Sequence, residues 1–140
     1  MWTRVCAGLT LVAVAAALGC GGGGEDKDKE AAGKACGAAP AAMQGSPDLP
    51  AGFAQPAEVT YTAQSKKGPT TEVDGYFAGD IDKAFDTYKG GFHDPFTVGH
   101  TEHEAVDAEI EFESSAQEGQ VKLLQTCKDR TNVTLTIRPK

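Results

Sequence analysis

Groups able to bind a metal ion or to transfer a proton are concentrated in one short stretch of the chain. His93, His100 and His103 occur there among four carboxylates, which are Asp94, Glu102, Glu104 and Asp107. Imidazole and carboxylate groups are ligands for zinc and copper. His100 and His103 are three residues apart, which brings side chains together on a helix, whereas on a strand they would point to opposite faces. The stretch has the pattern of a strand end or turn and predicts polar surface histidines, with His100 and His103 as candidate metal ligands.

A second feature is a row of carboxylates at every other position, formed by Asp107, Glu109, Glu111 and Glu113. On a strand these side chains share one face at intervals of about 6–7 Å, too far apart to hold a small ion without a neighbouring strand. We expect a solvated acidic face, balanced by Lys122 and Arg138. The same face is a candidate docking surface for a basic partner.

Motifs of common enzyme classes are missing from the predicted domain. It contains no Ser-x-x-Lys motif, no Gly-x-Ser-x-Gly motif and no glycine-rich phosphate loop that leads into a helix. The formal net charge of −7 disfavours nucleic acid and anionic lipid headgroups as partners. The sequence therefore predicts no enzymatic activity, no cofactor and no nucleic-acid partner.

One amphipathic helix is predicted over residues 80–89. Its apolar stripe recurs at helical spacing and consists of Ile81, Ala84, Phe85, Tyr88 and Phe92. Asp80 is the expected N-cap, and Gly90-Gly91 predicts a left-handed cap at the other end. A helix this short is not stable alone, so we expect it to pack on a sheet.

Alternating apolar and polar residues predict strands on both sides of this helix. Their apolar positions are Val59, Tyr61 and Ala63; Val73, Gly75 and Phe77; Phe96 and Val98; Val106, Ala108, Ile110 and Phe112; Val121 and Leu123; and Val133, Leu135 and Ile137. A turn is predicted at residues 65–69 and a loop around Gly119. Short connections favour antiparallel neighbours. The predicted fold class is α+β, an antiparallel sheet of five or six strands with the helix on one face, in the order β-β-α-β-β-β-β.

The register of one hairpin follows from this alternation. Pairing Phe112 with Val121 keeps both side chains on the core face and places Glu111 opposite Lys122 on the wet face. A shift by one residue would place Lys122 opposite Phe112, so the first register is expected.

The start of the chain has the pattern of an export signal. Arg4 precedes an apolar run over residues 7–18, which is too short to cross a bilayer and ends in Ala17-Leu18-Gly19-Cys20. This junction resembles the lipobox of bacterial lipoproteins, although the family prefers a larger aliphatic residue at the position of Ala17. The resemblance implies a signal peptide over residues 1–19, a lipid on the Cys20 thiol and a location on the extracytoplasmic side of the cell membrane. Ordinary secretory cleavage after Ala15-Ala16-Ala17 is the alternative.

Cysteine pairing helps to distinguish a lipidated Cys20 from ordinary secretory cleavage. Cleavage before Cys20 leaves that residue together with Cys36 and Cys127. If Cys20 carries a lipid, the other two form a pair, whereas a free Cys20 would leave an odd thiol in an oxidising compartment. We expect a Cys36–Cys127 disulfide, with pairing of Cys36 between molecules as the alternative.

The composition divides the remaining chain in two. Residues 20–52 contain four consecutive glycines, a mixed-charge run and a segment rich in Ala, Gly and Pro, which together are typical of a flexible tether. The small α+β domain is expected over residues 53–140, held at the membrane by the lipid.

These features predict a membrane-anchored module that binds another envelope protein through the wet sheet face or an exposed strand edge, without catalysing a reaction. Two alternatives belong to other classes. One is a small metal-binding or hydrolytic protein that uses His100 and His103. The other is a carrier that holds an apolar ligand between the helix and the sheet. The residues expected to line such a cavity are more simply explained as the hydrophobic core: Phe77, Phe85, Tyr88, Phe92 and Phe112.

Overall fold

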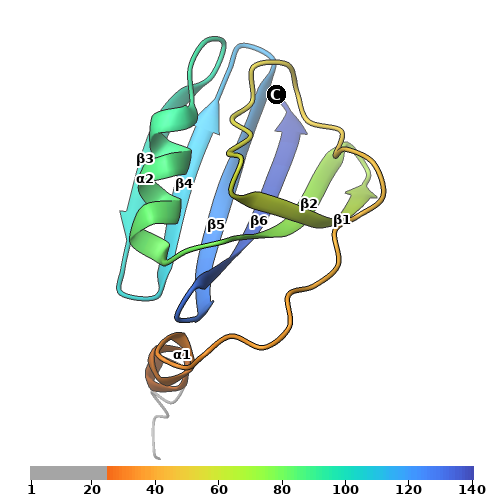
Figure 1. Cartoon of the computed structure of the whole chain (residues 1–140). Helices are drawn as coiled ribbons and strands as arrows, with labels where there is room; N and C mark the ends of the chain where they lie inside the picture. The colour runs from red at the N-terminus through yellow and green to blue at the C-terminus, as the bar shows by residue number, and fades with distance from the viewer. Residues whose placement is uncertain (1–24) are drawn as a thin grey trace, which may run out of the picture.

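The computed structural model describes residues 25–140 and contains one antiparallel sheet of six strands (Figure 1). The strands are β1 (Val59–Lys67), β2 (Thr70–Phe77), β3 (Thr97–His103), β4 (Asp107–Glu113), β5 (Gln117–Cys127) and β6 (Arg130–Pro139). Helix α1 (Glu25–Ala32) precedes β1, and helix α2 (Ile81–Gly91) connects β2 to β3. The strands lie in the order β1-β2-β6-β5-β4-β3. The predicted antiparallel sheet with one main helix is confirmed, whereas the predicted signal segment and Cys20 lie outside the described residues.

Helix α2 forms where its local sequence predicts a helix. The Asp80 carboxylate accepts a hydrogen bond of 2.9 Å from the backbone N–H of Lys83, which makes it the expected N-cap. The predicted left-handed cap is wrong, because Gly90 and Gly91 are not among the residues with positive φ and the chain leaves the helix through extended Phe92. The absent side chain at Gly91 serves packing instead, since a Cβ there would lie 3.1 Å from the Ala54 Cβ.

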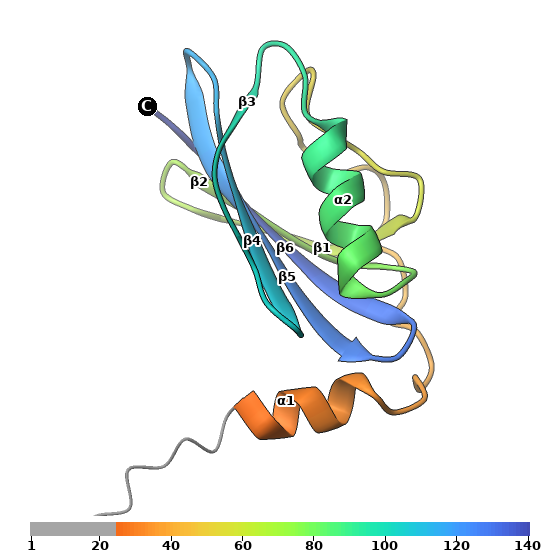
Figure 2. The ribbon, with the colours of Figure 1, turned by 90° about the vertical axis from the view of Figure 1, so that its left-hand side faces the viewer.

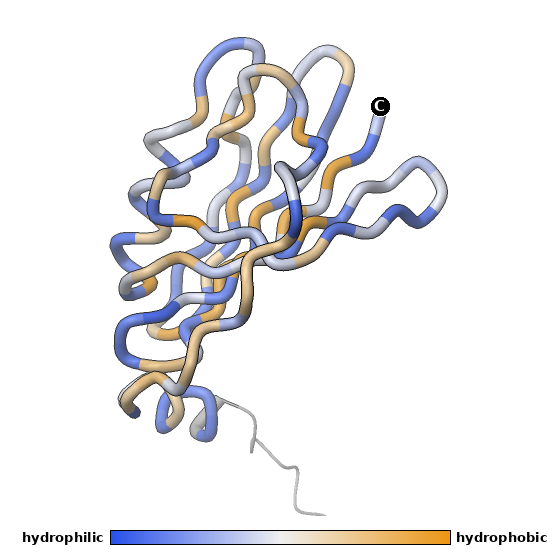
Figure 3. The backbone as a smooth tube through the Cα atoms, turned by 45° about the vertical axis from the view of Figure 1, so that its right-hand side comes forward, coloured by the Kyte–Doolittle hydropathy of each residue, from blue (hydrophilic) through white to orange (hydrophobic). Residues whose placement is uncertain are grey.

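The core lies between α2 and one face of the sheet, here called the inner face (Figure 2). The strands contribute Val73, Phe77, Ala108, Ile110, Phe112, Val121, Leu123, Val133, Leu135 and Ile137. Hydrophobic and hydrophilic positions alternate along the strands (Figure 3), so the opposite face, the outer face, is polar. The aromatic residues weighed as the lining of a ligand cavity are part of this core.

Phenylalanine rings fill one end of the core. Phe53, Phe92, Phe96 and Phe112 pack against one another with ring centroids 5.0 to 6.5 Å apart, mostly edge to face. Helix α2 adds Phe85 and Tyr88 to the core, and Tyr88 is fully buried.

The pairing of β4 with β5 differs from the predicted register by two residues. Ile110 lies opposite Val121, and Phe112 lies opposite Gly119. A shift by two keeps every side chain on its predicted face but changes its partner across the strands. Gly119 belongs to β5 and not to a loop, and the turn between the strands is formed by residues 114–116.

Two close approaches at Gly119 give the physical reason for this register. A Cβ at this position would lie 2.6 Å from Cζ of Phe112 and 2.1 Å from the backbone oxygen of Thr136. The Phe112 ring therefore needs the space that the missing side chain leaves.

Strand β1 departs from its predicted alternation at one residue. Tyr61 lies opposite Gly75, but Ala63 lies opposite Asp74, so Thr62 is an extra residue in a β-bulge. Ala63 is consequently exposed rather than on the core face, and that prediction is wrong.

The segment between α1 and β1 lies along the domain, although its composition predicts a flexible tether up to residue 52. The backbone N–H of Met43 donates a hydrogen bond of 2.8 Å to the carbonyl of Tyr61, and Phe53 is buried in the core. The expected disulfide joins Cys36 to Cys127, with their Cα atoms 5.1 Å apart. Long-range contacts thus order a segment that has no apolar period of its own.

Candidate functional site

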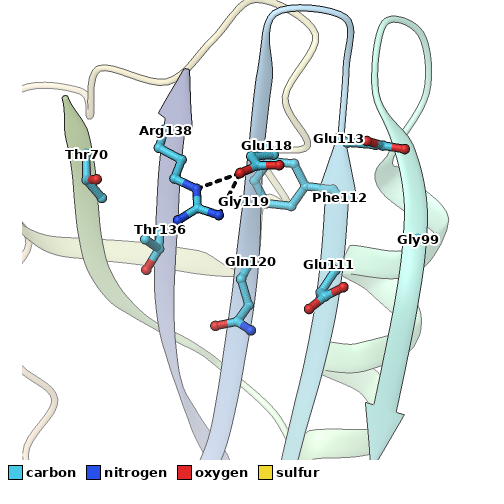
Figure 4. A pocket seen from close by; sticks show the side chains of 10 residues that line it. All are labelled: Thr70, Gly99, Glu111, Phe112, Glu113, Glu118, Gly119, Gln120, Thr136 and Arg138. Atoms are coloured by element: carbon cyan, nitrogen blue, oxygen red, sulfur yellow. Dashed lines mark hydrogen bonds and ion pairs between the residues drawn. The ribbon is translucent and has the colours of Figure 1, made fainter. Parts of the chain in front are cut away.

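The outer face of the sheet is hollowed at one end. This outer-face hollow has a volume of about 560 Å³ and is lined by residues of β3, β4, β5 and β6 and by one residue at the start of β2 (Figure 4). The lining residues are Thr70, Gly99, Glu111, Phe112, Glu113, Glu118, Gly119, Gln120, Thr136 and Arg138. The volume falls within the range of about 300–1,000 Å³ that is usual for ligand sites.

Strand alternation places the polar groups in the hollow. Neighbouring strands present their outer-face residues side by side, and Glu118 lies directly opposite Arg138 on β6. Gly99 leaves the β3 side of the hollow open, because the nearest atom to a Cβ built there is the Glu111 carbonyl oxygen at 3.8 Å. The register of β3 shifts between Val98 and Thr101, so this glycine lies within an irregular part of the strand.

Two basic side chains neutralise two of the carboxylates in the hollow. Glu113 and Glu118 are directly opposite each other on β4 and β5, a like-charge pair that is unfavourable by itself. Arg138 reaches Oε1 of Glu118 through Nη2 at 2.6 Å and Nε at 2.7 Å, and Lys140 Nζ lies 2.5 Å from Oε2 of Glu113. The hydrogen bond and the charge of Lys140 lower the pKa of Glu113.

The third carboxylate, that of Glu111, has no salt bridge within residues 25–140. Gln120 lies directly opposite it on β5, and Thr136 lies one strand further away, opposite Gln120 on β6. The hollow therefore keeps one exposed carboxylate without a lysine or arginine partner, and the Gln120 amide beside it can form hydrogen bonds.

All four carboxylates of the predicted acidic row belong to β4 and alternate with its buried core residues. Glu109 pairs with Lys122 at 3.7 Å, whereas Arg138 pairs with Glu118, a residue that the sequence analysis did not single out. Only Glu111 and Glu113 of the row line the hollow. The salt bridges of this face lie at the solvent-exposed surface and contribute little to stability.

The candidate metal ligands His100 and His103 lie on opposite faces of the sheet. His100 Nε2 is 3.1 Å from Oε1 of Glu102 on the outer face. That hydrogen bond, followed by the charges of Glu102 and Glu111, raises the pKa of His100. Within the described chain, no three His, Cys, Asp or Glu side chains converge to hold a metal ion.

His103 contacts α2 on the inner face. Its Nε2 is 3.0 Å from Oδ1 of Asp82, and its ring stacks on Phe85 at a centroid distance of 4.5 Å. His103 thus joins the edge strand to the helix, and its imidazole does not approach that of His100. The third histidine, His93, lies in the connection between α2 and β3.

Sequence reasoning missed part of the hollow for one reason. A glycine inside an alternating pattern was interpreted as a loop at Gly119, which hid the outer-face positions Glu118 and Gln120 that flank it. The available signal was the continuation of alternation from Gln117 to Leu123 through the glycine.

No helix in residues 25–140 is both long and apolar enough to span a bilayer. Comparison of the chain with protein-family models, with curated proteins and with solved structures found no match.

Proposed function

We propose that this protein is a lipid-anchored lipoprotein on the extracytoplasmic side of the cell membrane, and that its domain binds a basic segment of another envelope protein without catalysing a reaction. The observation that carries the binding role is the outer-face hollow with the exposed, unpaired carboxylate of Glu111. The Cys36–Cys127 disulfide supports the anchor, because it leaves Cys20 as the remaining cysteine of a chain cleaved at the lipobox-like junction.

A lysine or arginine side chain has the chemistry that this hollow complements. Its cationic group would lie against Glu111, and a remaining N–H donor would reach the amide oxygen of Gln120 on the next strand. Electrostatic complementarity of this kind increases association rates and selects the partner more than it adds affinity. Binding should therefore weaken as the salt concentration rises.

The test is the binding of a Lys- and Arg-rich peptide to the purified full-length protein, measured by fluorescence anisotropy. Glu111→Lys should weaken binding at least tenfold, about 1.4 kcal/mol, because it places a like charge where the peptide binds. Asp86→Lys is the matched control: it makes the same charge change on the exposed side of α2, away from the hollow. Equal losses of peptide affinity in both variants would show that the effect comes from net charge alone, and the hollow would then not be the binding site.

A second variant tests shape rather than charge. Gly99→Leu adds a side chain where a Cβ meets nothing closer than 3.8 Å, so the sheet tolerates it while the hollow is filled. Loss of peptide binding is expected. Unchanged binding in this variant would mean that the peptide binds elsewhere.

The partner itself is accessible in intact cells. A photocrosslinking amino acid at Gln120 should capture an envelope protein through a Lys- or Arg-rich segment, identified by mass spectrometry, and Glu111→Lys should abolish that crosslink. A crosslink that persists in Glu111→Lys would contradict recognition by this carboxylate.

A further inference from the structure

One end of the sheet is joined to α1, and we call this end the base. The backbone N–H of Lys128, in the β5–β6 turn, donates a hydrogen bond of 2.8 Å to the carbonyl of Lys34. The Cys36–Cys127 disulfide fixes the chain at the same end, and Ala32 at the end of α1 is buried. Helix α1 consequently lies across the base (Figure 2).

The outer-face hollow lies at the opposite end of the same strands. Strand β5 runs from Gln117 to Cys127, so it contributes Glu118 to the hollow and Cys127 to the base. These two residues are nine positions apart, and Gln120, opposite Glu111, is seven positions from Cys127. At about 3.3 Å per residue the hollow is separated from the base by about 23–30 Å. Figure 1 shows the same arrangement, with α1 at one end of the sheet and the C-terminal end of β6 at the other.

The connection from Cys20 to the base is short. Cys20 and Glu25 are five positions apart, and five residues span at most about 17 Å even when fully extended. A tether of 33 residues, as the composition predicts, would allow any orientation of the domain. Because the segment after α1 lies along the sheet, only these five positions separate the lipidated residue from the folded part.

We propose that the base faces the bilayer and that the hollow points away from it, about 23–30 Å further out. This inference rests on the proposed lipid anchor and narrows the partner of the same site. The partner segment must approach from the aqueous compartment, as an exposed basic loop or tail, rather than as a basic stretch adjoining a transmembrane helix in the same membrane. The carboxylates of β4 oppose the alternative in which the outer face lies on an anionic membrane surface.

Orientation is measured on the lipidated full-length protein in phosphatidylcholine–phosphatidylglycerol vesicles that contain a headgroup dye. A fluorescent amino acid is placed at Asp129 in the base or at Ser115 in the β4–β5 turn beside the hollow, both exposed positions. Energy transfer to the dye should be several-fold more efficient from Asp129. Equal transfer, or more from Ser115, overturns the proposed orientation.

An insertion provides the matched control. Twenty Gly/Ser residues placed between Gly24 and Glu25 give a coil of about 25 Å root-mean-square length, so the difference between the two probes should largely disappear. A difference that persists unchanged would show that the short connection does not set the orientation.

The partner class is tested in the same vesicles. A Lys/Arg peptide free in solution should bind the anchored protein, whereas the same peptide held at the membrane by a short acyl anchor should not; comparable binding of both overturns the inference. If the protein fails to remain with the vesicles, the lipid anchor itself is wrong. If peptide binding in solution survives Glu111→Lys, the proposed function fails even where the orientation is correct.

Discussion

The substitution Gly119→Ala tests the observed register of β4 and β5. The new Cβ would lie 2.1 Å from the Thr136 carbonyl oxygen and 2.6 Å from the Phe112 ring, so something must move. Overpacking in a core costs about 1–3 kcal/mol, and the upper end applies because one neighbour is the backbone of paired strand β6. The stiffer unfolded chain returns about 0.4–1 kcal/mol. We expect a net loss of about 2 kcal/mol, or a fall of about 10 °C in Tm.

The assay is urea and thermal unfolding followed by circular dichroism under non-reducing conditions. Gly99→Ala is the matched control on β3, since its Cβ would have no neighbour closer than 3.8 Å. This control should be neutral or stabilise the domain by up to about 1 kcal/mol. If Gly119→Ala is tolerated as well as Gly99→Ala, Phe112 does not lie over Gly119 and the observed register is refuted.

Three further changes test the core, the disulfide and the charged outer face. Phe85→Ala removes a buried ring between α2 and the sheet and should cost about 3–5 kcal/mol in urea unfolding; a loss below 1 kcal/mol would place Phe85 outside the core. Reduction of the Cys36–Cys127 disulfide, which spans 91 positions, should lower Tm. The chain-entropy model limits the loss in the free energy of unfolding to about 4–5 kcal/mol. An unchanged Tm would show that residues 34–58 stay on the sheet without the disulfide. The pKa of His100 is raised above its ordinary value of 6.5, mainly by Glu102, so the stability from this pair is complete below the unfolded pKa and is lost as pH rises through the higher folded pKa. NMR titration should show that Glu102→Gln lowers the pKa of His100, and an unchanged pKa would contradict the pairing.

The parts of the fold that sequence reasoning predicted are those set by local interactions. The helix at residues 80–89 was predicted from an N-cap and an apolar stripe, and the structure extends it only to Gly91. The strands were predicted from alternation, which reports burial of one face directly. Contacts between residues distant in the sequence determined the remaining features of the fold. The bulge at Thr62 lies beside a close backbone approach at Gly75, where a Cβ would lie 2.5 Å from the Thr60 oxygen.

The order of residues 34–58 shows another limit of composition. This segment has few large apolar residues and no apolar period, which is typical of a tether. In the structure, a few specific contacts order it: Phe53 enters the aromatic cluster, Met43 pairs with the edge of β1, and Asp48 forms an ion pair with Lys66 at 2.9 Å. Such contacts bring together residues that are distant in the sequence, and no window of the sequence contains both partners.

The candidate site depends on the register that alternation could not determine. A period of two specifies the face of each side chain, and a slip of two residues leaves every face unchanged. The predicted register pairs Glu111 with Lys122, which would neutralise that carboxylate. In the structure Lys122 instead lies opposite Glu109, to which it forms a salt bridge of 3.7 Å. Glu111 is thereby left without a lysine or arginine partner beside the open position of Gly99, so the space that Phe112 needs at Gly119 also determines which carboxylate of the outer face has no salt bridge.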